Sequence, residues 1–224
     1  MTTGDPLLAR NWRKSKVLRC HDGKEKMGLV CFLRERYAER FFEPITHLTG
    51  APSSEHGYGF AIMSLCCLLI ETIECYRLGW PSSHPAELRA LEALPQNLAA
   101  PEPYYKLQRP FEHQFSSELA FEKFFDQAEH CRHFGDMKGK GREFYRAIRC
   151  GLLHQAQTKD GWRILTHGKC WDDAPDQRTI NRNKFSRLLK QCFDELLEQL
   201  EARDWDEEPW KSTRKKIWWL AQTS

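Results

Sequence analysis

The stretch GYGFAIMSLCCLLIETIECYRLGW, residues 57–80, is the most hydrophobic segment of a 224-residue chain. Its apolar residues occupy nearly every position around a helical wheel, which is typical of a helix that is buried on nearly all sides. Gly79 and Pro81 together are a strong signal for the end of that helix. The sequence therefore predicts a central, buried helix against which the other elements pack.

The longest apolar run, FAIMSLCCLLI, stops at Glu71 and is too short to span a bilayer. The N-terminal stretch MTTGDPLLARNWRKSKVLRC lacks the continuous apolar core of a secretory signal. We therefore expect a cytoplasmic protein with no membrane partner. In that compartment the nine scattered cysteines are expected to be reduced thiols rather than disulfides.

Helical periodicity recurs on both sides of the central stretch, so we predict an all-α fold. The further helices are expected at residues 27–48, 116–134, 142–158, 181–202 and 209–221. Ser116 or Ser117 should cap the second of these and Asn181 the fourth, while Pro44 should interrupt the first. One strand-like piece, WRILTHG at 162–168, predicts a small β-hairpin after the helix at 142–158.

The region from Pro81 to Pro110 is rich in prolines, and we interpret it as a long surface excursion. We predict a single helical domain over 1–224, with its core at about 30–200 and a C-terminal extension at 205–224. The net charge of +3 permits anionic partners without requiring them.

The segment IRCGLLHQA, residues 148–156, carries an arginine and a histidine in an otherwise apolar helix. On a wheel the core-facing stripe consists of Phe144, Tyr145, Ile148, Leu152 and Ala156, and a second sector holds Arg149, Cys150, Leu153 and His154. Arg149 and His154 diverge by about 140°, so the wheel predicts no direct pairing between them. Gly151 costs about 1 kcal/mol in a helix, and its simplest explanation is the avoidance of a clash with a neighbouring helix.

The chemistry of this second sector suits an anionic substrate. His154 can act as a general acid or base near neutral pH, and Arg149 can bind a phosphate through its guanidinium. RNA carries its own nucleophile, the 2′-hydroxyl, so cleavage needs no metal if charge on the phosphorus centre is stabilised. A two-fold dimer would bring two such helices into one cleft.

The pattern Arg-x-x-x-x-His, within FYRAIRCGLLHQAQTKDGWRI at 144–164, resembles the HEPN superfamily, in particular a branch of uncharacterised bacterial and plasmid-borne HEPN proteins. The resemblance implies a bundle of about four core helices and a homodimer. It also implies metal-independent endoribonuclease activity in active members. Many members work in toxin–antitoxin, abortive-infection or other anti-phage systems, so an antitoxin or other regulatory protein is an expected partner.

Carried over by position, Arg149 matches the arginine of the motif and His154 matches its histidine. The residue after the arginine is commonly polar in the superfamily, often asparagine, whereas here it is Cys150, a weaker hydrogen-bonding group. An acidic residue on an earlier helix often supports the site. Glu71 and Glu74 both interrupt the buried helix, and we prefer Glu71 because it lies where the apolar run is densest.

Basic residues near the motif are candidates for RNA contacts. The glycine-rich segment before it supplies Lys138, Lys140 and Arg142. The C-terminal segment STRKKIWW, 212–219, combines Arg214, Lys215 and Lys216 with Trp218 and Trp219, a mixture that can grip phosphates and stack bases. For this segment we favour a structural interpretation, in which the tryptophans dock and the cations remain in water.

Other constellations are weaker. His130 and His133 have the spacing of two metal ligands on a helix, with Cys131 between them, but no second cluster completes a site. Cys20 and His21 have the same deficiency. Cys150 and His154 share a helical face, although cysteine hydrolases usually take their histidine from a distant segment. We therefore expect no metal and no cofactor.

The leading hypothesis is a homodimeric, metal-independent endoribonuclease with His154 as acid/base and Arg149 as phosphate clamp. The alternative is a non-catalytic HEPN-like binding or regulatory module, in which these two residues make structural contacts at a dimer interface.

Overall fold

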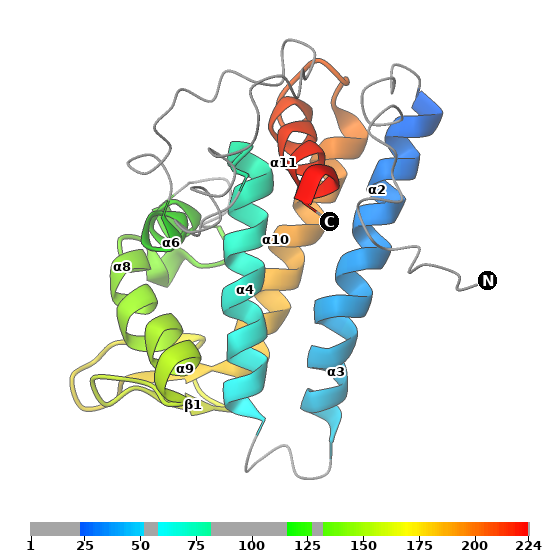
Figure 1. Cartoon of the computed structure of the whole chain (residues 1–224). Coiled ribbons are helices and arrows are strands. Elements are labelled where there is room, and N and C mark those ends of the chain that lie inside the picture. Colours follow the sequence, from blue (N-terminus) through cyan, green and yellow to red (C-terminus); the bar gives the residue numbers. More distant parts are fainter. Residues whose placement is uncertain (1–22, 52–57, 82–115, 127–131, 224) are drawn as a thin grey trace. The chain divides into compact units, whose positions relative to one another are not determined.

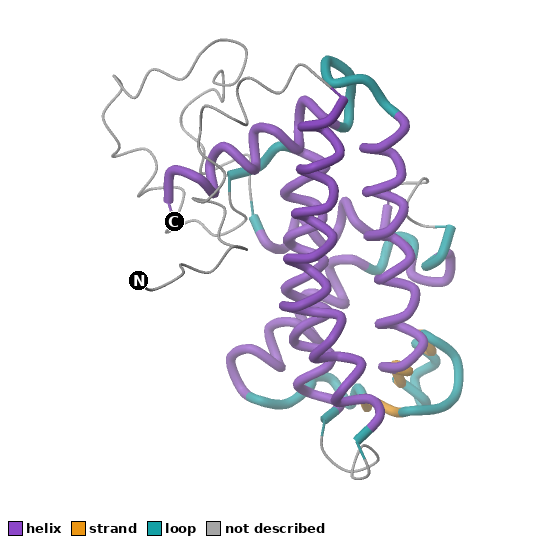
Figure 2. The backbone as a smooth tube through the Cα atoms, turned by 90° about the vertical axis from the view of Figure 1, so that its right-hand side faces the viewer, coloured by secondary structure: helices purple, strands orange, loops and turns teal. Residues whose placement is uncertain are grey.

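The computed structural model describes residues 23–51, 58–81, 116–126 and 132–223 (Figure 1). Helices dominate these residues, and the few strands are short (Figure 2). The longer helices are α2 (Gly23–Tyr37), α3 (Glu43–Gly50), α4 (Gly59–Leu78), α6 (Ser117–Asp126), α10 (Arg182–Ala202) and α11 (Trp210–Thr223). The prediction of a mostly helical chain with a small β element is confirmed. Most of the predicted proline-rich excursion lies outside the described residues.

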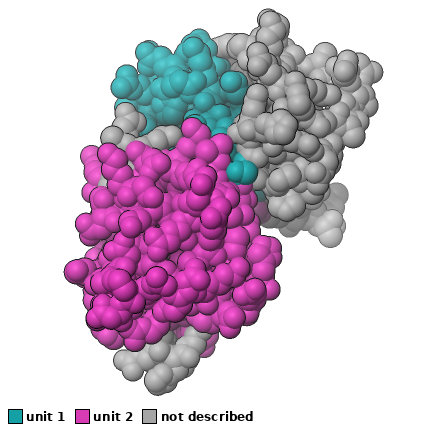
Figure 3. All heavy atoms as spheres, turned by 90° about the vertical axis from the view of Figure 1, so that its left-hand side faces the viewer, with its two compact units in different colours: residues 1–36, 73–116, 196–224 teal, residues 37–72, 117–195 magenta. Residues whose placement is uncertain are grey.

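The chain divides into two compact units, coloured separately in Figure 3. Unit 1 comprises residues 1–36, 73–116 and 196–224, and unit 2 comprises residues 37–72 and 117–195. Helices α2, α4 and α10 contribute residues to both units. The candidate residues of the Arg-x-x-x-x-His motif and Glu71 all belong to unit 2, whereas Glu74 belongs to unit 1.

Helix α4 is the predicted buried helix. Most of its side chains are inaccessible to solvent, with Phe60 and Leu68 as the large exposed exceptions. It ends at Gly79, whose φ of +65° is a left-handed conformation that glycine adopts without strain. By length and composition the whole helix could cross a membrane, although its longest apolar run ends at Glu71. Its burial within the protein is that of a core helix.

The region around Pro44 departs from the prediction. Instead of ending there, the helix continues as a π-helical turn, Ala38–Phe42, followed by α3 with Pro44 in its first turn. Proline is tolerated in a first turn because its missing N–H has no helical partner there. The sequence indicates an interruption at Pro44, and in the structure this is a change from the π-helical turn to the α-helix α3.

Unit 2 is built around an aromatic core. Helix α6 packs against α8 (Gly141–Phe144), and the ring of Phe144 stacks on Phe121 and on Phe185 of α10. Phe125 and Phe134 complete the cluster. His133 and Phe134 lie in a turn, so the helix predicted for 116–134 does not reach its expected end.

A three-stranded sheet closes one end of the aromatic core. Strands β1 (Arg163–Leu165), β2 (Trp171–Asp172) and β3 (Thr179–Asn181) are arranged in the order β1-β3-β2. β1 is the predicted strand, but it pairs parallel with β3. The hairpin is formed by β2 and β3, which are antiparallel.

The cap predicted for α10 is confirmed. The Oδ1 atom of Asn181 accepts hydrogen bonds from the backbone N–H groups of Asn183 and Lys184, at 3.1 and 3.0 Å. Its amide nitrogen donates to the carbonyl of Gly168. The same side chain therefore starts the helix and holds the loop before β2. Ser117 behaves differently, because its hydroxyl donates to a carboxylate on α4.

Unit 1 contains the predicted C-terminal helix, α11. Trp210, at its start, is fully buried and donates from its indole nitrogen to the carbonyl of Leu200 at 2.6 Å. Trp205 packs against the same ring.

The expectation that the cations of α11 remain in water is wrong for Arg214 and Lys216, which are buried. Lys216 reaches the carbonyl of Pro81, a neutral acceptor that offsets part of its lost hydration. The side chains of Trp218 and Trp219 lie outside the described residues.

Candidate functional site

The helix that carries the motif is locally unwound. Helix α8 continues into a π-helical turn, Tyr145–Arg149, and then into α9 (Cys150–Gln155). The N–H of Cys150 donates to the carbonyl of Tyr145, five residues back, where an α-helix would use the residue four back. Single π-helical turns of this kind occur frequently at functional sites. This one ends at Arg149.

Arg149 lies between an acid and a base. Its Nε atom is 2.9 Å from Oε1 of Glu71, and its Nη1 atom is 3.4 Å from Nε2 of His154. The wheel prediction that Arg149 and His154 do not pair is therefore wrong. A wheel describes where Cβ atoms point, whereas the long arginine side chain carries its guanidinium far from its own Cβ.

The Glu71 carboxylate is held at both oxygens. Oε1 faces Arg149, and Oε2 accepts a hydrogen bond of 2.8 Å from the hydroxyl of Ser117. The side chains of Glu71 and Arg149 are only 11% and 12% exposed, so solvent screens this ion pair weakly. Of the two acidic candidates, Glu71 is the one that contacts Arg149; Glu74 pairs with Arg77 in unit 1.

The electrostatics of the cluster fix three protonation states. Burial favours a lower pKa for Arg149, but the Glu71 carboxylate outweighs it and raises the pKa, so the guanidinium is charged. Burial, reinforced by a hydrogen bond with Cys150, raises the pKa of Tyr145 to about 12. Burial also raises the pKa of Cys67, one turn before Glu71. Tyr145 and Cys67 are therefore neutral at physiological pH.

His154 is the exposed member of the cluster. An arginine can only donate, so in its contact with Arg149 the Nε2 atom of His154 is an acceptor. The proton of the neutral ring is then on Nδ1. Between Cys150 and His154 the described contacts include no hydrogen bond, and the thiol instead interacts with Tyr145. The geometry therefore couples His154 to arginine rather than to cysteine.

Gly151 is explained by the chain that follows the helix. A Cβ atom at this position would lie 2.4 Å from the carbonyl oxygen of Gln157. The turn after α9 folds back over the helix, and the N–H of Lys159 donates to the carbonyl of Ala147 at 2.9 Å. The neighbour that excludes a side chain is thus the turn itself, and not another helix as the sequence suggested. Ala156, predicted for the core stripe, is exposed and ends the helix with a φ of +52°.

Two of the three predicted RNA-binding cations have carboxylate partners. Lys140 is 2.7 Å from Asp173, and this hydrogen bond raises the pKa of Lys140. Arg142 pairs with both Glu118 and Glu122. Lys138 is exposed and forms no ion pair within the described residues. The sequence did not reveal these partners, because they lie on separate elements.

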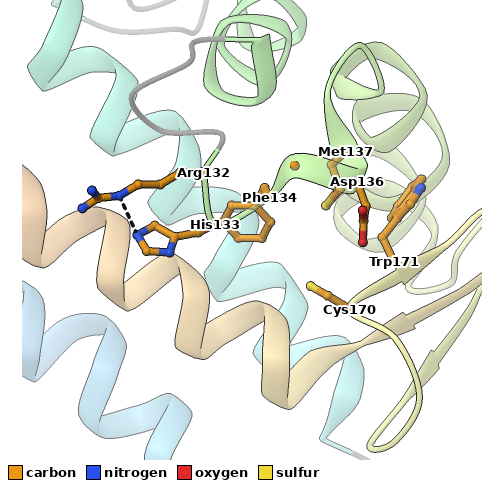
Figure 4. A pocket seen from close by; sticks show the side chains of 8 residues that line it. Arg132, His133, Phe134, Asp136, Met137, Cys170 and Trp171 are labelled. Atoms are coloured by element: carbon orange, nitrogen blue, oxygen red, sulfur yellow. Dashed lines mark hydrogen bonds between the residues drawn. The ribbon is translucent and has the colours of Figure 1, made fainter.

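Residues that precede α8 and residues at the start of β2 line a separate pocket of about 260 Å³. They are Arg132, His133, Phe134, Gly135, Asp136, Met137, Cys170 and Trp171. Figure 4 shows Arg132 and His133 on one side and Asp136 and Trp171 on the other. Both Arg132 and His133 contact Glu195. Burial alone would raise the pKa of Glu195, but the hydrogen bonds from Arg132 and His133 lower it, so the carboxylate is charged and pairs with the Arg132 guanidinium.

The metal interpretation gains no support within the part of the chain that the structure describes. No group of three or more His, Cys, Asp and Glu side chains there is placed to hold a metal ion. His133 is engaged by Glu195 at 2.7 Å. His130, Cys131, Cys20 and His21 lie outside the described residues.

Comparison of the chain with protein-family models, curated proteins and solved structures gave no match. The functional argument therefore depends on the residues and contacts given above.

Proposed function

We propose that the chain is a metal-independent endoribonuclease of the HEPN type, cleaving RNA by attack of the 2′-hydroxyl on the adjacent phosphate. The observation that carries this proposal is the arrangement of Glu71, Arg149 and His154, in which a buried carboxylate orients a charged guanidinium beside an exposed imidazole. All three lie in unit 2.

In this proposal His154 removes the proton from the 2′-hydroxyl, or supplies one to the leaving oxygen. The Nε2 atom of this exposed imidazole carries the lone pair that a general base needs. To reach that lone pair, the 2′-hydroxyl takes the place of the Arg149 N–H, which lies 3.4 Å away at Nη1. Arg149 stabilises the negative charge that develops on the phosphate oxygens. Glu71 is a positioning residue, because it holds Nε of Arg149 and leaves most of the other N–H groups of the guanidinium for the substrate.

The proposal includes a homodimer. One arginine and one histidine supply a single charge and a single proton-transfer group, whereas cleavage needs a base for the attacking hydroxyl and an acid for the leaving group. A two-fold axis near α9 would provide both from identical residues. The HEPN-like bundle, the cytoplasmic RNA target and an antitoxin or other regulatory partner belong to the same proposal.

The second candidate is a non-catalytic HEPN-like binding or regulatory module. The observation that favours it is the burial of Arg149, whose contacts with Glu71 are those of a structural ion pair. In that case Arg149 and His154 contribute to folding or to a dimer interface. Neither the wild type nor a variant at His154 would then cleave any RNA.

Expression of the protein in a bacterial host tests the leading proposal. Wild-type protein is expected to slow growth and to fragment cellular RNA, and His154→Ala is expected to abolish both effects. His167→Ala is the matched control, because His167 is an exposed histidine of the same unit outside the cluster. Equal toxicity of wild type and His154→Ala, at equal expression, would contradict the proposal.

A further inference from the structure

Two arginines lie at one edge of the small sheet, where the adjacent strands β1 and β3 begin. Arg163 is the first residue of β1, and Arg178 immediately precedes β3. The backbone N–H of Arg163 donates to the carbonyl of Arg178 at 2.8 Å. In the parallel ladder Arg163 is paired with Thr179, so Arg178 is one residue before its cross-strand partner. Both belong to unit 2.

Each guanidinium is anchored by a neutral group. An Nη2 hydrogen of Arg163 is donated to the carbonyl of Gln177 at 3.1 Å, and Nη1 of Arg178 donates to the carbonyl of Asp160. Neither arginine forms an ion pair with a carboxylate in the described segments. Because a guanidinium has five N–H donors, each side chain is oriented by one bond while its charge and further donors stay available. Lys140 and Arg142 lack this property, since carboxylates neutralise them.

Arg178 is held in an unfavourable backbone conformation, with a φ of +38°. Asp160, whose carbonyl it contacts, has a φ of +55°, which aspartate adopts more readily than most residues. For an arginine this left-handed conformation is disfavoured. An arginine at position 178 is therefore not the residue that the backbone favours, and such strain is concentrated at functional sites.

The same edge is connected to the candidate site. The turn that leads from His154 to β1 is attached to the motif helix by the bond from Lys159 to Ala147. The same turn links α9, which carries His154, to β1 in the chain. Only eight residues, 155–162, separate His154 from Arg163 along the chain.

We propose that Arg163 and Arg178 form a phosphate-binding pair that holds the backbone of the RNA strand being cleaved. This inference rests on the proposed function for its choice of polymer. The pair recognises phosphodiester oxygens and not bases, so it contributes affinity without sequence preference and its contribution weakens as salt rises.

Binding of a non-cleavable RNA tests the pair. The probe is a fluorescent single-stranded oligonucleotide with 2′-O-methyl groups, which lacks the nucleophile, and affinity is measured by fluorescence anisotropy over a series of salt concentrations. The variants are Arg163→Gln, Arg178→Gly and the double variant. Glycine is chosen at position 178 because it adopts the left-handed conformation without strain. Lys211→Gln, an exposed lysine of unit 1, controls for the loss of one charge.

Each phosphate contact contributes about 0.7 to the slope of log K against log salt for single strands. We expect the double variant to lose about 1.4 from this slope and at least tenfold in affinity at low salt, while Lys211→Gln stays close to wild type. An unchanged slope in the double variant, an equal change in Lys211→Gln, or no binding by the wild type would overturn the pair.

The outcomes separate this inference from the proposed function. If the double variant loses affinity for the modified RNA while no unmodified RNA is cleaved by the wild type, the phosphate pair stands and the nuclease proposal fails. If cleavage depends on His154 but the double variant binds like the wild type, the nuclease proposal stands and the pair fails. A lower melting temperature without a change in slope would assign the two arginines a structural role only.

Discussion

The Nε atom of Arg149 lies 2.9 Å from Oε1 of Glu71, and this ion pair joins the motif helix to a helix 78 residues earlier in the chain. Both side chains are almost fully buried. Such a pair contributes little net stability compared with apolar residues, but loss of one partner leaves a buried charge uncompensated. The pair therefore orients Arg149, and loss of either partner is expected to destabilise the fold.

Removal of the carboxylate should destabilise the fold. We expect Glu71→Ala to lower the free energy of unfolding by about 3 kcal/mol, because it leaves the buried Arg149 guanidinium without its carboxylate partner. Glu71→Gln, which keeps an acceptor, should cost less. Urea denaturation measures both. Arg34→Ala breaks the exposed pair with Glu201 and should cost less than about 1 kcal/mol; an equal cost at the two sites would contradict the burial argument.

Gly151 should not tolerate a side chain. A methyl group there meets the carbonyl of Gln157, so Gly151→Ala is expected to displace the turn after α9 and to cost about 1–3 kcal/mol. Gly50 is also helical, but a Cβ atom on it meets nothing within 4 Å. Gly50→Ala is therefore expected to leave stability unchanged or raise it slightly. Thermal melting of the two variants compares them, and similar melting temperatures would refute the explanation.

Loss of the cap at Asn181 should lower the free energy of unfolding more than loss of an ordinary surface cap. Asn181→Ala removes two bonds to the start of α10 and one to Gly168, and we expect a loss of about 2 kcal/mol. Asn183→Ala is the control, because the side-chain oxygen of Asn183 has no hydrogen-bond partner among the residues that the structure describes. Denaturant titration should show a much smaller loss for the control.

Tyr145 should make stability depend on alkaline pH. Its folded pKa of about 12 lies above the ordinary value of 10, so the folded state holds the phenolic proton more tightly than the unfolded state. This contribution is complete below about pH 10 and is lost as the pH rises toward 12. Tyr145→Phe is expected to flatten that part of the stability profile. Absorbance at the phenolate band is titrated for the wild type and for Tyr145→Phe, and the difference reports the ionisation of Tyr145. A transition in that difference near pH 10 would contradict the burial of the hydroxyl.

Periodic patterns predicted the elements well, because burial imposes them locally. The stretch at 57–80, the cap at Asn181 and the strand at 163–165 all match the structure. The pairing of Arg149 with His154 was not predictable from a regular wheel, since a π-helical turn and a long side chain determine it. Nor did the sequence indicate that Arg142 is neutralised, because its partners Glu118 and Glu122 lie on another helix.

The preference for Glu71 over Glu74 came from the density of the apolar run, and Glu71 is the residue that contacts Arg149. Arg163 and Arg178 carried no such signal. They became candidates only when the structure placed them on adjacent strands, each with a neutral hydrogen-bond partner.

Cleavage of RNA by the purified protein in the presence of a chelator is the most direct test of the central claim. Wild-type protein and Gln155→Ala, which alters the exposed neighbour of His154, are expected to cut RNA equally well with and without EDTA. His154→Ala is expected to lose at least a hundredfold in rate while it stays folded. Cleavage that survives in His154→Ala, or that stops when EDTA is added to the wild type, would contradict the account.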